Sequence, residues 1–331
     1  MTAVAASGVV SVAPVTTMPA HAVVLTAPLP GSLDATVRER YGAVGWEEAR
    51  AAGELAGARV AVTTARFGVT SELLDAAPGL EAIVSYGAGY DNLDLPRLVE
   101  RGIRVSTTPD VLSAAVADTA VGLLIDVLRG LTEADRFVRE GRWHDAPFPF
   151  RRDVTGRRVG ILGLGRIGRA IARRLEGFDC EISYHSRRPR TDVPYRYAED
   201  VHALARDADA LVIAAPGGAH TRHLVDADVL RALGPDGVLV NIARGSVVDE
   251  NALIAALRDG TIAGAGLDVF TDEPRVPAGL LDLPQVVLTP HLGSATVETR
   301  AAMAAGVLAN LDAWADRGDL ATPLDLNAAM A

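Results

Sequence analysis

The feature that most constrains this chain is residues 159–168, which read VGILGLGRIG. A short apolar run leads into Gly163-x-Gly165-x-x-Gly168, and the helical pattern RAIARRLEGF follows. In a dinucleotide-binding strand-turn-helix the first glycine allows the tight turn, the second lets the backbone approach a pyrophosphate, and the third lets the helix pack closely on its strand. The helix N-terminus then favours negative charge. The alternative is a tight glycine turn without a ligand, but the flanking strand and helix favour dinucleotide binding.

The next predicted strand, CEISYH, indicates which dinucleotide binds. NAD sites usually carry Asp or Glu at this strand tip, where it accepts hydrogen bonds from the ribose 2′-OH. Here Ser186, Arg187 and Arg188 follow the strand instead. A hydroxyl and two guanidiniums offer donors and positive charge to a 2′-phosphate. We therefore expect NADPH/NADP+ as the cofactor, with NADH possible but weaker, although Arg187, Arg188 and Arg190 could also form an ordinary solvated loop.

Composition excludes several function classes. The net charge of -10 gives no basic field for nucleic acid, and the apolar runs are shorter than the ~20 residues of a membrane span. The single cysteine, Cys180, excludes an intramolecular disulfide and a multi-cysteine metal site, and no metal is expected. The chain contains no lysine, so lysine Schiff-base and Walker-type mechanisms are impossible. We expect a cytoplasmic protein that binds neither membrane nor nucleic acid, with a flexible N-terminal extension at 1–20 rather than a secretory signal.

Strand and helix patterns alternate in two series, which predicts an α/β fold with two doubly wound parallel sheets. In the first series four predicted strands alternate with helices at 33–41, 70–78 and 94–102. In the second, six strands match the count of the dinucleotide fold. The predicted strands lie within 21–28, 57–64, 80–89, 102–109, 157–163, 181–186, 210–216, 237–243, 263–270 and 286–291.

Two long helical patterns bear on domain organisation. Residues 113–143 are predicted as one helix with apolar residues on more than one face, so we expect it to be buried between domains or at the contact of a symmetric homodimer. The closing helix at 297–318 has no strand after it, and we expect it to return to the first domain. The predicted domains are 21–118 with 298–331 for substrate binding, and 119–297 for dinucleotide binding.

Three polar residues follow successive strands of the second series, and parallel sheets bind ligands at that edge. Arg244 can clamp a carboxylate through two hydrogen bonds, and His291 can exchange the proton that hydride transfer to a carbonyl requires. Glu273 beside the histidine would stabilise the imidazolium and orient it. Singly each has an ordinary structural reading: a structural histidine, a helix-end cation and a turn carboxylate. Together, after a dinucleotide motif, they indicate catalysis.

At these residues the chain resembles the D-isomer-specific 2-hydroxyacid dehydrogenases, and within them the NADP-dependent glyoxylate/hydroxypyruvate reductase branch. The resemblance covers nearly the whole chain after residue 20. It implies a Rossmann-like cofactor domain inserted in a flavodoxin-like substrate domain. It is carried by SYGAGYDNLDL (85–95), GILGLGRIGRAIARRL (160–175), VLVNIARGSVVDENALIAAL (238–257), GAGLDVFTDEP (264–274) and LTPHLGSAT (288–296).

The resemblance also implies roles for individual residues. Arg244 would bind the substrate carboxylate and keto oxygen, His291 would protonate the developing alkoxide, and Glu273 would pair with His291. The substrate carboxylate would bind the backbone at Gly87, Ala88 and Gly89 next to Tyr86, although a plain turn is the alternative there. The implied cofactor-binding residues are Gly163, Leu164, Gly165, Arg166, Ile167, Gly168, Ser186, Arg187, Arg188, Ala215, Pro216, Thr221, Ile242, Ala243, Asp268 (near the nicotinamide) and Gly293.

The predicted activity is NADPH-dependent reduction of glyoxylate or hydroxypyruvate to a D-2-hydroxy acid. Reduction of 2-ketogluconate or of an aryl pyruvate such as hydroxyphenylpyruvate is the alternative within the same class. A formate dehydrogenase is disfavoured, because that branch pairs its histidine with Gln rather than with Glu273. A redox-sensing corepressor is the alternative from outside catalysis. Trp143, Phe148, Phe150 and Tyr86 are candidates for lining the substrate side-chain pocket, or for ordinary packing.

Overall fold

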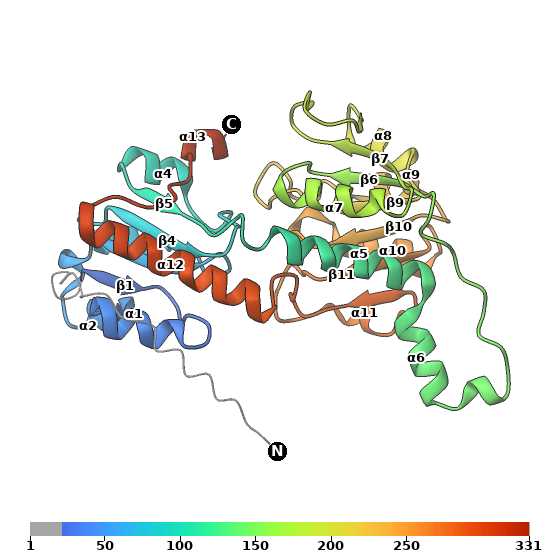
Figure 1. Cartoon of the computed structure of the whole chain (residues 1–331), viewed down its shortest axis with the longest axis horizontal. Helices are drawn as coiled ribbons and strands as arrows, with labels where there is room; N and C mark the ends of the chain where they lie inside the picture. Colours follow the sequence, from blue (N-terminus) through green and yellow to red (C-terminus); the bar gives the residue numbers. More distant parts are fainter. Residues whose placement is uncertain (1–21, 331) are drawn as a thin grey trace, which may run out of the picture. The chain divides into compact units, whose positions relative to one another are not determined.

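The computed structural model describes residues 22–330, so the predicted extension at 1–20 lies outside the described residues. The chain divides into two compact units, each built around one parallel sheet. One unit holds the chain up to Thr108 and again from Ala304, and the other holds Pro109–Met303. The first unit is therefore discontinuous, and the blue and red ends of the chain share it in Figure 1.

The sheet of the first unit has five parallel strands in the order β2-β1-β3-β4-β5. This 2-1-3-4-5 order is that of flavodoxin-like sheets. Strands β1, β3 and β4 are buried along their whole length, as expected for apolar runs covered on both faces. The bounds are β1 Val23–Leu25, β2 Val44–Gly45, β3 Val60–Thr64, β4 Ala82–Tyr86 and β5 Arg104–Ser106.

Helices at both ends of the chain complete this unit. The last part of α12 lies against α1, where the Tyr41 hydroxyl donates to Asp312 Oδ1 at 2.7 Å. Beyond α12, the Leu324 N–H donates to the carbonyl of Val105 at 2.7 Å and so extends the edge of β5. The helices are α1 Leu33–Tyr41, α2 Trp46–Ala51, α3 Ser71–Ala76, α4 Leu95–Glu100, α12 Val297–Arg317, α13 Leu326–Met330 and the short 3₁₀ helix η1 Leu55–Gly57.

The sheet of the second unit has seven parallel strands in the order β12-β11-β10-β9-β6-β7-β8. Counted from β6, this is the 3-2-1-4-5-6 order of the dinucleotide-binding fold with one further strand. The order reverses between β6 and β9, which is the switch point where such sheets bind ligands. The bounds are β6 Arg158–Leu162, β7 Glu181–His185, β8 Arg196–Tyr197, β9 Ala210–Ile213, β10 Val238–Asn241, β11 Gly264–Leu267 and β12 Val286–Leu288.

Helices cover this second sheet, and α5 is its largest cover. It contacts β10, β11 and α7, while α8, α9 and α10 contact one another in series (Figure 1). The bounds are α5 Ser113–Arg129, α6 Leu131–Arg139, α7 Arg166–Glu176, α8 Val201–Arg206, α9 Ala227–Leu233, α10 Glu250–Arg258, α11 Ala278–Leu281, and the 3₁₀ helices η2 Arg142–His144 and η3 Gly245–Val247. The predicted α/β fold class with two doubly wound sheets is thus confirmed.

The single helix predicted over 113–143 is wrong. Helix α5 ends at Gly130, whose φ of 64° is left-handed, and α6 starts directly after it. A glycine adopts this conformation without the steric cost of a Cβ, so the chain can turn sharply there. Helix α5 buries eight residues whereas α6 buries only Phe137, which shows that the two pieces have different surroundings.

Other differences from the sequence concern short strands and boundaries. Strands β2 and β8 were not predicted, because two residues show no alternation. The division between units falls after Thr108 and before Ala304, whereas the sequence suggested 118 and 298. Helix α5 accounts for the first difference, because it packs on β10, β11 and α7 and belongs whole to the second unit.

Candidate active site

Six strands of the second unit end in one registered row. Pairing joins His185 to Leu162, Leu162 to Ile213, Ile213 to Asn241, Asn241 to Leu267 and Leu267 to Leu288. Each of these is the last residue of its strand. The polar residues predicted from strand ends are therefore brought to the same edge of one sheet.

The glycine motif forms the turn between β6 and α7. Gly163 has a φ of 97°, and a Cβ there would lie 2.6 Å from the backbone nitrogen of Ala215. A Cβ at Gly168 would lie 2.1 Å from the carbonyl oxygen of Gly163. A Cβ at Gly165 would meet nothing within 4 Å. The first and third glycines are thus required by packing, whereas the middle one faces open space.

Helix α7 begins at this open space without a capping side chain. Its N-cap is Gly165, and its first turn, Arg166 to Gly168, points unpaired backbone N–H groups outward. The Arg166 side chain forms an ion pair with Asp110 at 2.6 Å, and Leu164 is buried. An open backbone surface and free N–H groups at a helix N-terminus fit a pyrophosphate.

Ser186 connects this turn to the tip of β7. Its hydroxyl accepts a hydrogen bond from the Leu164 N–H at 3.0 Å, and the Gly163 N–H donates to the carbonyl of His185 at 2.8 Å. The hydroxyl proton of Ser186 remains available to a ligand. Arg187 and Arg188 are exposed, and within 22–330 neither guanidinium forms a hydrogen bond or ion pair. The tip of β7 therefore offers uncompensated positive charge and no carboxylate.

The remaining predicted cofactor residues lie after β9 and β10. Ala215 is buried against Gly163, and Thr221 closes the following turn by donating to the carbonyl of Pro216 at 2.7 Å. Ile242 is buried, and the Ala243 N–H donates to Asn241 Oδ1 at 3.0 Å. These residues shape the loops, and their contribution to a ligand would come mainly from backbone groups.

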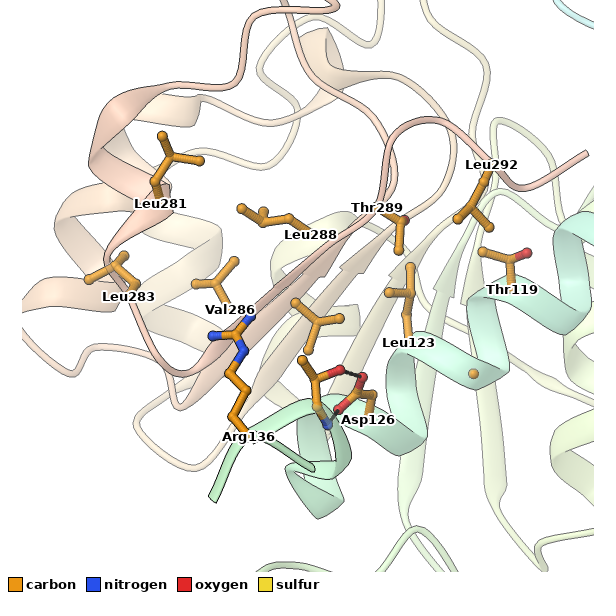
Figure 2. A pocket seen from close by; sticks show the side chains of 13 residues that line it. Thr119, Leu123, Asp126, Arg136, Leu281, Leu283, Val286, Leu288, Thr289 and Leu292 are labelled. Atoms are coloured by element: carbon orange, nitrogen blue, oxygen red, sulfur yellow. Dashed lines mark hydrogen bonds between the residues drawn. The ribbon is translucent and has the colours of Figure 1, made fainter. Parts of the chain in front are cut away.

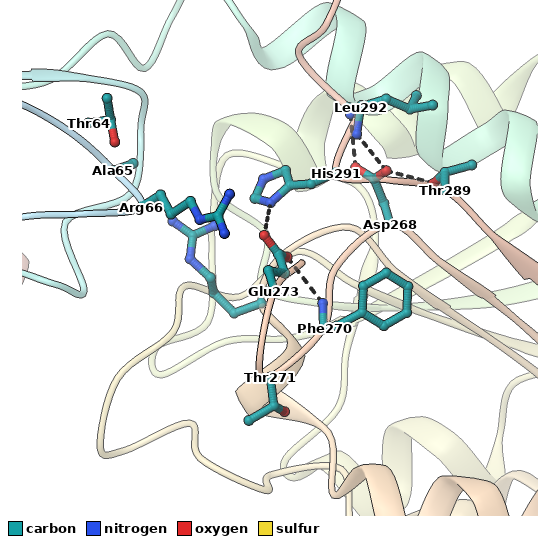
Figure 3. Close-up of polar contacts among 12 residues, drawn as sticks. Thr64, Ala65, Arg66, Asp268, Phe270, Thr271, Glu273, Thr289, His291 and Leu292 are labelled. Atoms are coloured by element: carbon teal, nitrogen blue, oxygen red, sulfur yellow. Dashed lines mark hydrogen bonds and ion pairs between the residues drawn. The ribbon is translucent and has the colours of Figure 1, made fainter. Parts of the chain in front are cut away.

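His291 and Glu273 lie side by side after β12 and β11 (Figure 3). His291 Nδ1 is 2.8 Å from Glu273 Oε2, and Glu273 Oε1 accepts the Phe270 N–H at 3.1 Å. Since a carboxylate only accepts, Nδ1 carries the proton in this pair and Nε2 is left to exchange protons with a ligand. The side chain of His291 is 44% exposed and that of Glu273 only 17%, so the histidine is the member that a substrate can reach.

Asp268, which was predicted to lie near the nicotinamide, directly follows β11. It is buried, and its carboxylate accepts hydrogen bonds from the Thr289 hydroxyl and from the N–H groups of Leu292 and Gly293. These donors come from the loop that carries His291, as Figure 3 shows. Thr289 was missed from the sequence, because it lay inside the predicted strand at 286–291, whereas β12 ends at Leu288.

Arg244 follows β10, beside the strand that leads to Glu273. Its backbone is held by Asn241, a buried residue whose Nδ2 donates to the Arg244 carbonyl at 2.9 Å. Its guanidinium donates through Nη1 to the carbonyl of Ala243 at 2.7 Å. Asn241 was also missed from the sequence, where it lay within the predicted apolar strand at 237–243.

In the first unit, the turn after β4 is built around Gly87. Its φ is 132°, a Cβ there would lie 2.7 Å from the Cβ of Ala65, and its N–H donates to Thr108 Oγ1 at 3.0 Å. Ala88 and Gly89 are half-buried at the carboxyl edge of this sheet, while Tyr86 is buried. The backbone of Ala88 and Gly89 is thus the accessible part of the turn.

The aromatic residues proposed for a substrate pocket have other surroundings. Phe148 packs edge-on against Phe137 at 5.4 Å between ring centroids, and Trp143 and Phe150 are exposed. Tyr86 belongs to the core of its sheet. Phe148 and Tyr86 thus make the ordinary packing contacts that were the alternative to a pocket lining.

A groove of about 380 Å³ lies along β12, the edge strand of the second sheet (Figure 2). Its lining is largely apolar and includes Leu123 of α5 and Val286 and Leu288 of β12. Arg136 of α6 lies at its rim, and the nearby Leu281 is 60% exposed. An apolar groove of this kind on a sheet edge is typical of a protein-protein contact.

Comparison with known proteins decides the family. Residues 121–293 match the family described as D-isomer specific 2-hydroxyacid dehydrogenase, NAD binding domain. The chain belongs to this family. It is thus an oxidoreductase that uses a nicotinamide dinucleotide to interconvert 2-oxo and 2-hydroxy acids.

Relatives of this dehydrogenase include glyoxylate/hydroxypyruvate reductase A of Arabidopsis thaliana, 49% identical over 80% of this chain and 85% of the relative. Hydroxyphenylpyruvate reductase of Plectranthus scutellarioides is 48% identical over the same shares. Among solved structures, the NADPH-dependent glyoxylate/hydroxypyruvate reductase of Sinorhizobium meliloti, in complex with NADP and malonate, matches with a TM-score of 0.86 and 43% identity, over 92% of this chain and 96% of that one.

The helices of this dehydrogenase were searched for segments that could cross a membrane. Within residues 22–330, no helix combines the length and the apolar character that a membrane crossing requires.

Proposed function

We propose that this dehydrogenase reduces small 2-oxo acids, glyoxylate and hydroxypyruvate in particular, to D-2-hydroxy acids with NADPH. The observation that carries the proposal is the His291–Glu273 pair at the same sheet edge as the open turn at Gly165. Reduction of a carbonyl needs a hydride and a proton. The bound dinucleotide supplies the hydride, and an exposed imidazole held by a carboxylate can supply the proton.

The chain's own residues divide the remaining work in this proposal. His291 Nε2 gives its proton to the substrate oxygen as charge develops there, and Glu273 stabilises the imidazolium before the transfer. Arg244 binds the substrate carboxylate and keto oxygen through its paired N–H donors. In the turn at Gly87, Ala88 and Gly89, the N–H groups of Ala88 and Gly89 also donate to the substrate carboxylate, whereas the Gly87 N–H holds the turn by donating to Thr108. Substrate binding would thus involve the first unit and cofactor binding the second.

Preference for NADPH is supported by the tip of β7. Ser186 presents its hydroxyl proton there, and Arg187 and Arg188 present guanidiniums that have no hydrogen-bond or ion-pair partner among residues 22–330. The strand tip carries no acid that would repel a 2′-phosphate. The NADP-bound relative from Sinorhizobium meliloti points the same way. The other predicted cofactor residues, including Asp268, Thr221 and Gly293, remain in the proposal as loop and backbone contributors.

A panel of substrates and variants tests this function. NADPH oxidation is measured with glyoxylate, hydroxypyruvate, pyruvate, 2-ketogluconate and hydroxyphenylpyruvate, and the panel is repeated with NADH. His291→Ala should lower kcat by about 10² to 10⁴-fold and leave NADPH affinity unchanged. His202→Ala, which removes an exposed histidine of α8, is the control. Near-normal turnover in His291→Ala would exclude the proposed acid.

The cofactor preference has its own test. Arg187→Ala with Arg188→Ala should weaken NADPH binding by about 1.5 to 3 kcal/mol for each lost charged contact and leave NADH nearly unaffected. The control, Arg206→Ala with Arg258→Ala, removes two exposed guanidiniums from α8 and α10. Equal losses for NADPH and NADH would show that the pair does not bind the 2′-phosphate.

Hydroxyphenylpyruvate is the second candidate substrate, because the Plectranthus enzyme is almost as similar to this chain as the Arabidopsis one. A higher kcat/KM for the aryl substrate than for hydroxypyruvate would favour it. The same panel decides for or against 2-ketogluconate.

We also propose a symmetric homodimer that buries the groove along β12. Leu123, Val286 and Leu288 leave an apolar surface at the sheet edge, and the exposed Phe150 and Trp143 lie on the same unit. Two-fold contacts are the commonest way to cover such a surface. Light scattering at micromolar concentration should give twice the 34.6 kDa chain mass, and a monomeric mass would refute the dimer.

A further inference from the structure

His291 has a backbone conformation that a residue with a side chain rarely adopts. Its φ of 53° is left-handed, where a Cβ approaches the following carbonyl oxygen. Among the residues from 22 to 330, only Asp179 and His223 share this property outside glycine. Because the conformation is disfavoured, the surrounding structure has to hold it.

Three hydrogen bonds of the loop around His291 converge on one buried carboxylate, and a further one joins the Thr289 N–H to the carbonyl of Leu267 at 2.9 Å. Asp268 Oδ1 accepts the Thr289 hydroxyl at 2.6 Å and the Leu292 N–H at 2.8 Å, while Oδ2 accepts the Gly293 N–H at 2.9 Å. These donors lie on both sides of His291 in the sequence. The loop is therefore pinned before and after the histidine to a single point at the end of β11 (Figure 3).

Asp268 depends strongly on these donors. Its exposed fraction is 1%, and within the described chain it forms no ion pair. A buried carboxylate without a cation is stabilised by the hydrogen bonds it accepts. Two of the three come from backbone, so the Thr289 hydroxyl is the only side-chain donor in the set.

We propose that Thr289 is a positioning residue, which fixes the left-handed backbone of His291 through Asp268 and thereby aims the imidazole. The inference rests on the proposed role of His291 as the proton donor. Thr289 touches neither the histidine ring nor Glu273 in any hydrogen bond of the structure, so it acts through the loop. Without its hydroxyl the loop keeps the backbone bond from Thr289 to Leu267 but loses its link to Asp268 on the N-terminal side, and His291 can relax toward an ordinary φ.

The test separates positioning from a general structural role. Thr289→Val keeps the shape of the side chain and removes the hydroxyl donor. Thr289→Ala also removes the hydroxyl but does not place a methyl group against the carboxylate, and Thr289→Ser keeps the hydroxyl. The control is Thr261→Val, because Thr261 makes the same 2.6 Å hydroxyl-to-carboxylate bond to Asp259 at the end of α10, away from the loop. The measurements are kcat and KM for glyoxylate and the NADPH Kd from fluorescence quenching.

Thr289→Val and Thr289→Ala should lower kcat by about 10 to 100-fold, since a misplacement of about 1 Å has effects of this size, while the NADPH Kd stays within about threefold. Thr289→Ser should recover kcat to within about threefold of wild type, and Thr261→Val should match wild type. If Val does not fold, the Ala and Ser pair carries the comparison.

Three results would overturn the proposal. They are unchanged kcat in the variants without a hydroxyl, equal losses with and without the hydroxyl, and a loss of NADPH affinity in proportion to kcat. His291→Ala, measured in parallel, distinguishes a failure of the proposed function from a failure of the positioning role of Thr289. If it retains turnover, the proposed function fails; if it loses turnover while Thr289→Val does not, only the positioning role fails.

Discussion

Two alanine substitutions three residues apart should affect different properties of this enzyme. Gly168→Ala should lower the stability of the fold, whereas Gly165→Ala should lower the affinity for NADPH. A Cβ at Gly165 would meet nothing within 4 Å, whereas a Cβ at Gly168 would lie 2.1 Å from the carbonyl oxygen of Gly163. Both residues belong to the turn that leads into α7, and neither has a left-handed φ. The difference between them is therefore one of space, not of backbone strain.

Gly168→Ala should destabilise the folded protein. Real Cβ atoms essentially never approach another atom within 3.0 Å, and the atom in the way is backbone, so β6 and α7 must move apart. Overpacking of this kind costs about 3 kcal/mol, which for a unit of this size lowers Tm by about 6 to 12 °C. The thermal effect should be present without any cofactor.

Gly165→Ala should instead spare the fold and weaken the cofactor. Alanine at an N-cap costs only about 0.5 kcal/mol relative to glycine, so Tm without cofactor should stay within about 2 °C. A methyl group in the space left for the pyrophosphate should cost about 1 to 3 kcal/mol of binding, or roughly 5 to 150-fold in the NADPH Kd.

Thermal unfolding with and without NADPH, together with calorimetric titration, distinguishes the two variants. Wild type and Gly168→Ala should both gain Tm on adding NADPH, and Gly165→Ala should gain much less. Wild-type affinity in Gly165→Ala would show that the open space is not the pyrophosphate site. A Tm loss in Gly165→Ala equal to that in Gly168→Ala would refute the packing argument.

Three further predictions concern charge and backbone. Glu273→Gln removes the carboxylate that lies 2.8 Å from His291 Nδ1 and orients the ring, so kcat/KM for reduction should fall while NADPH affinity is kept, and an unchanged kcat/KM would contradict this. Burial alone raises the pKa of Asp209, but hydrogen bonds from the Arg158 guanidinium and N–H outweigh burial and hold the pKa below its usual value. This contact therefore stabilises the fold at a pH above the unfolded pKa of about 3.9, and the stabilisation is lost as the pH falls through the folded pKa. Asp209→Asn should lower the free energy of unfolding by about 1 kcal/mol at pH 7, measured by urea unfolding. A difference from wild type that persists at pH 2 would contradict this explanation. Gly130→Ala places a Cβ at a φ of 64° and should destabilise by about 1 to 2 kcal/mol, with unchanged stability as the contrary result.

Sequence patterns predicted those elements whose ends carry their own local signal. Helix α1 lies where the pattern at 33–41 placed it, because Gly42 at φ 63° stops it. The break between α5 and α6 was missed although Gly130 was visible, since a glycine inside an apolar helical pattern is compatible with either a continuous or a broken helix. The two-residue strands β2 and β8 form only because neighbouring strands pair with them.

For the candidate site, the sequence offered one signal, which was the position of polar residues after predicted parallel strands. Arg244, Glu273 and His291 were singled out because polar residues after parallel strands meet at one edge, and the registered strand ends do bring their loops to that edge. The partners of Asp268 could not be predicted in this way. Its contact with Thr289 depends on how two loops pack after their strands end, and no periodicity records that.

The return of the chain to the first unit has a consequence for the order of folding. Residues 109–303 form one uninterrupted segment, so all partners of the second sheet are present before synthesis reaches the end of the chain. The first unit cannot be completed until its last residues have been synthesised. Its hydrogen bonds between Tyr41 and Asp312 and between Leu324 and Val105 each join residues more than 200 positions apart. Contacts this distant in sequence are slow to form. A nascent chain should therefore expose the unfinished edge at β5 for longest, and this edge is where a chaperone would act and where truncation after residue 303 would leave the sheet without its cover.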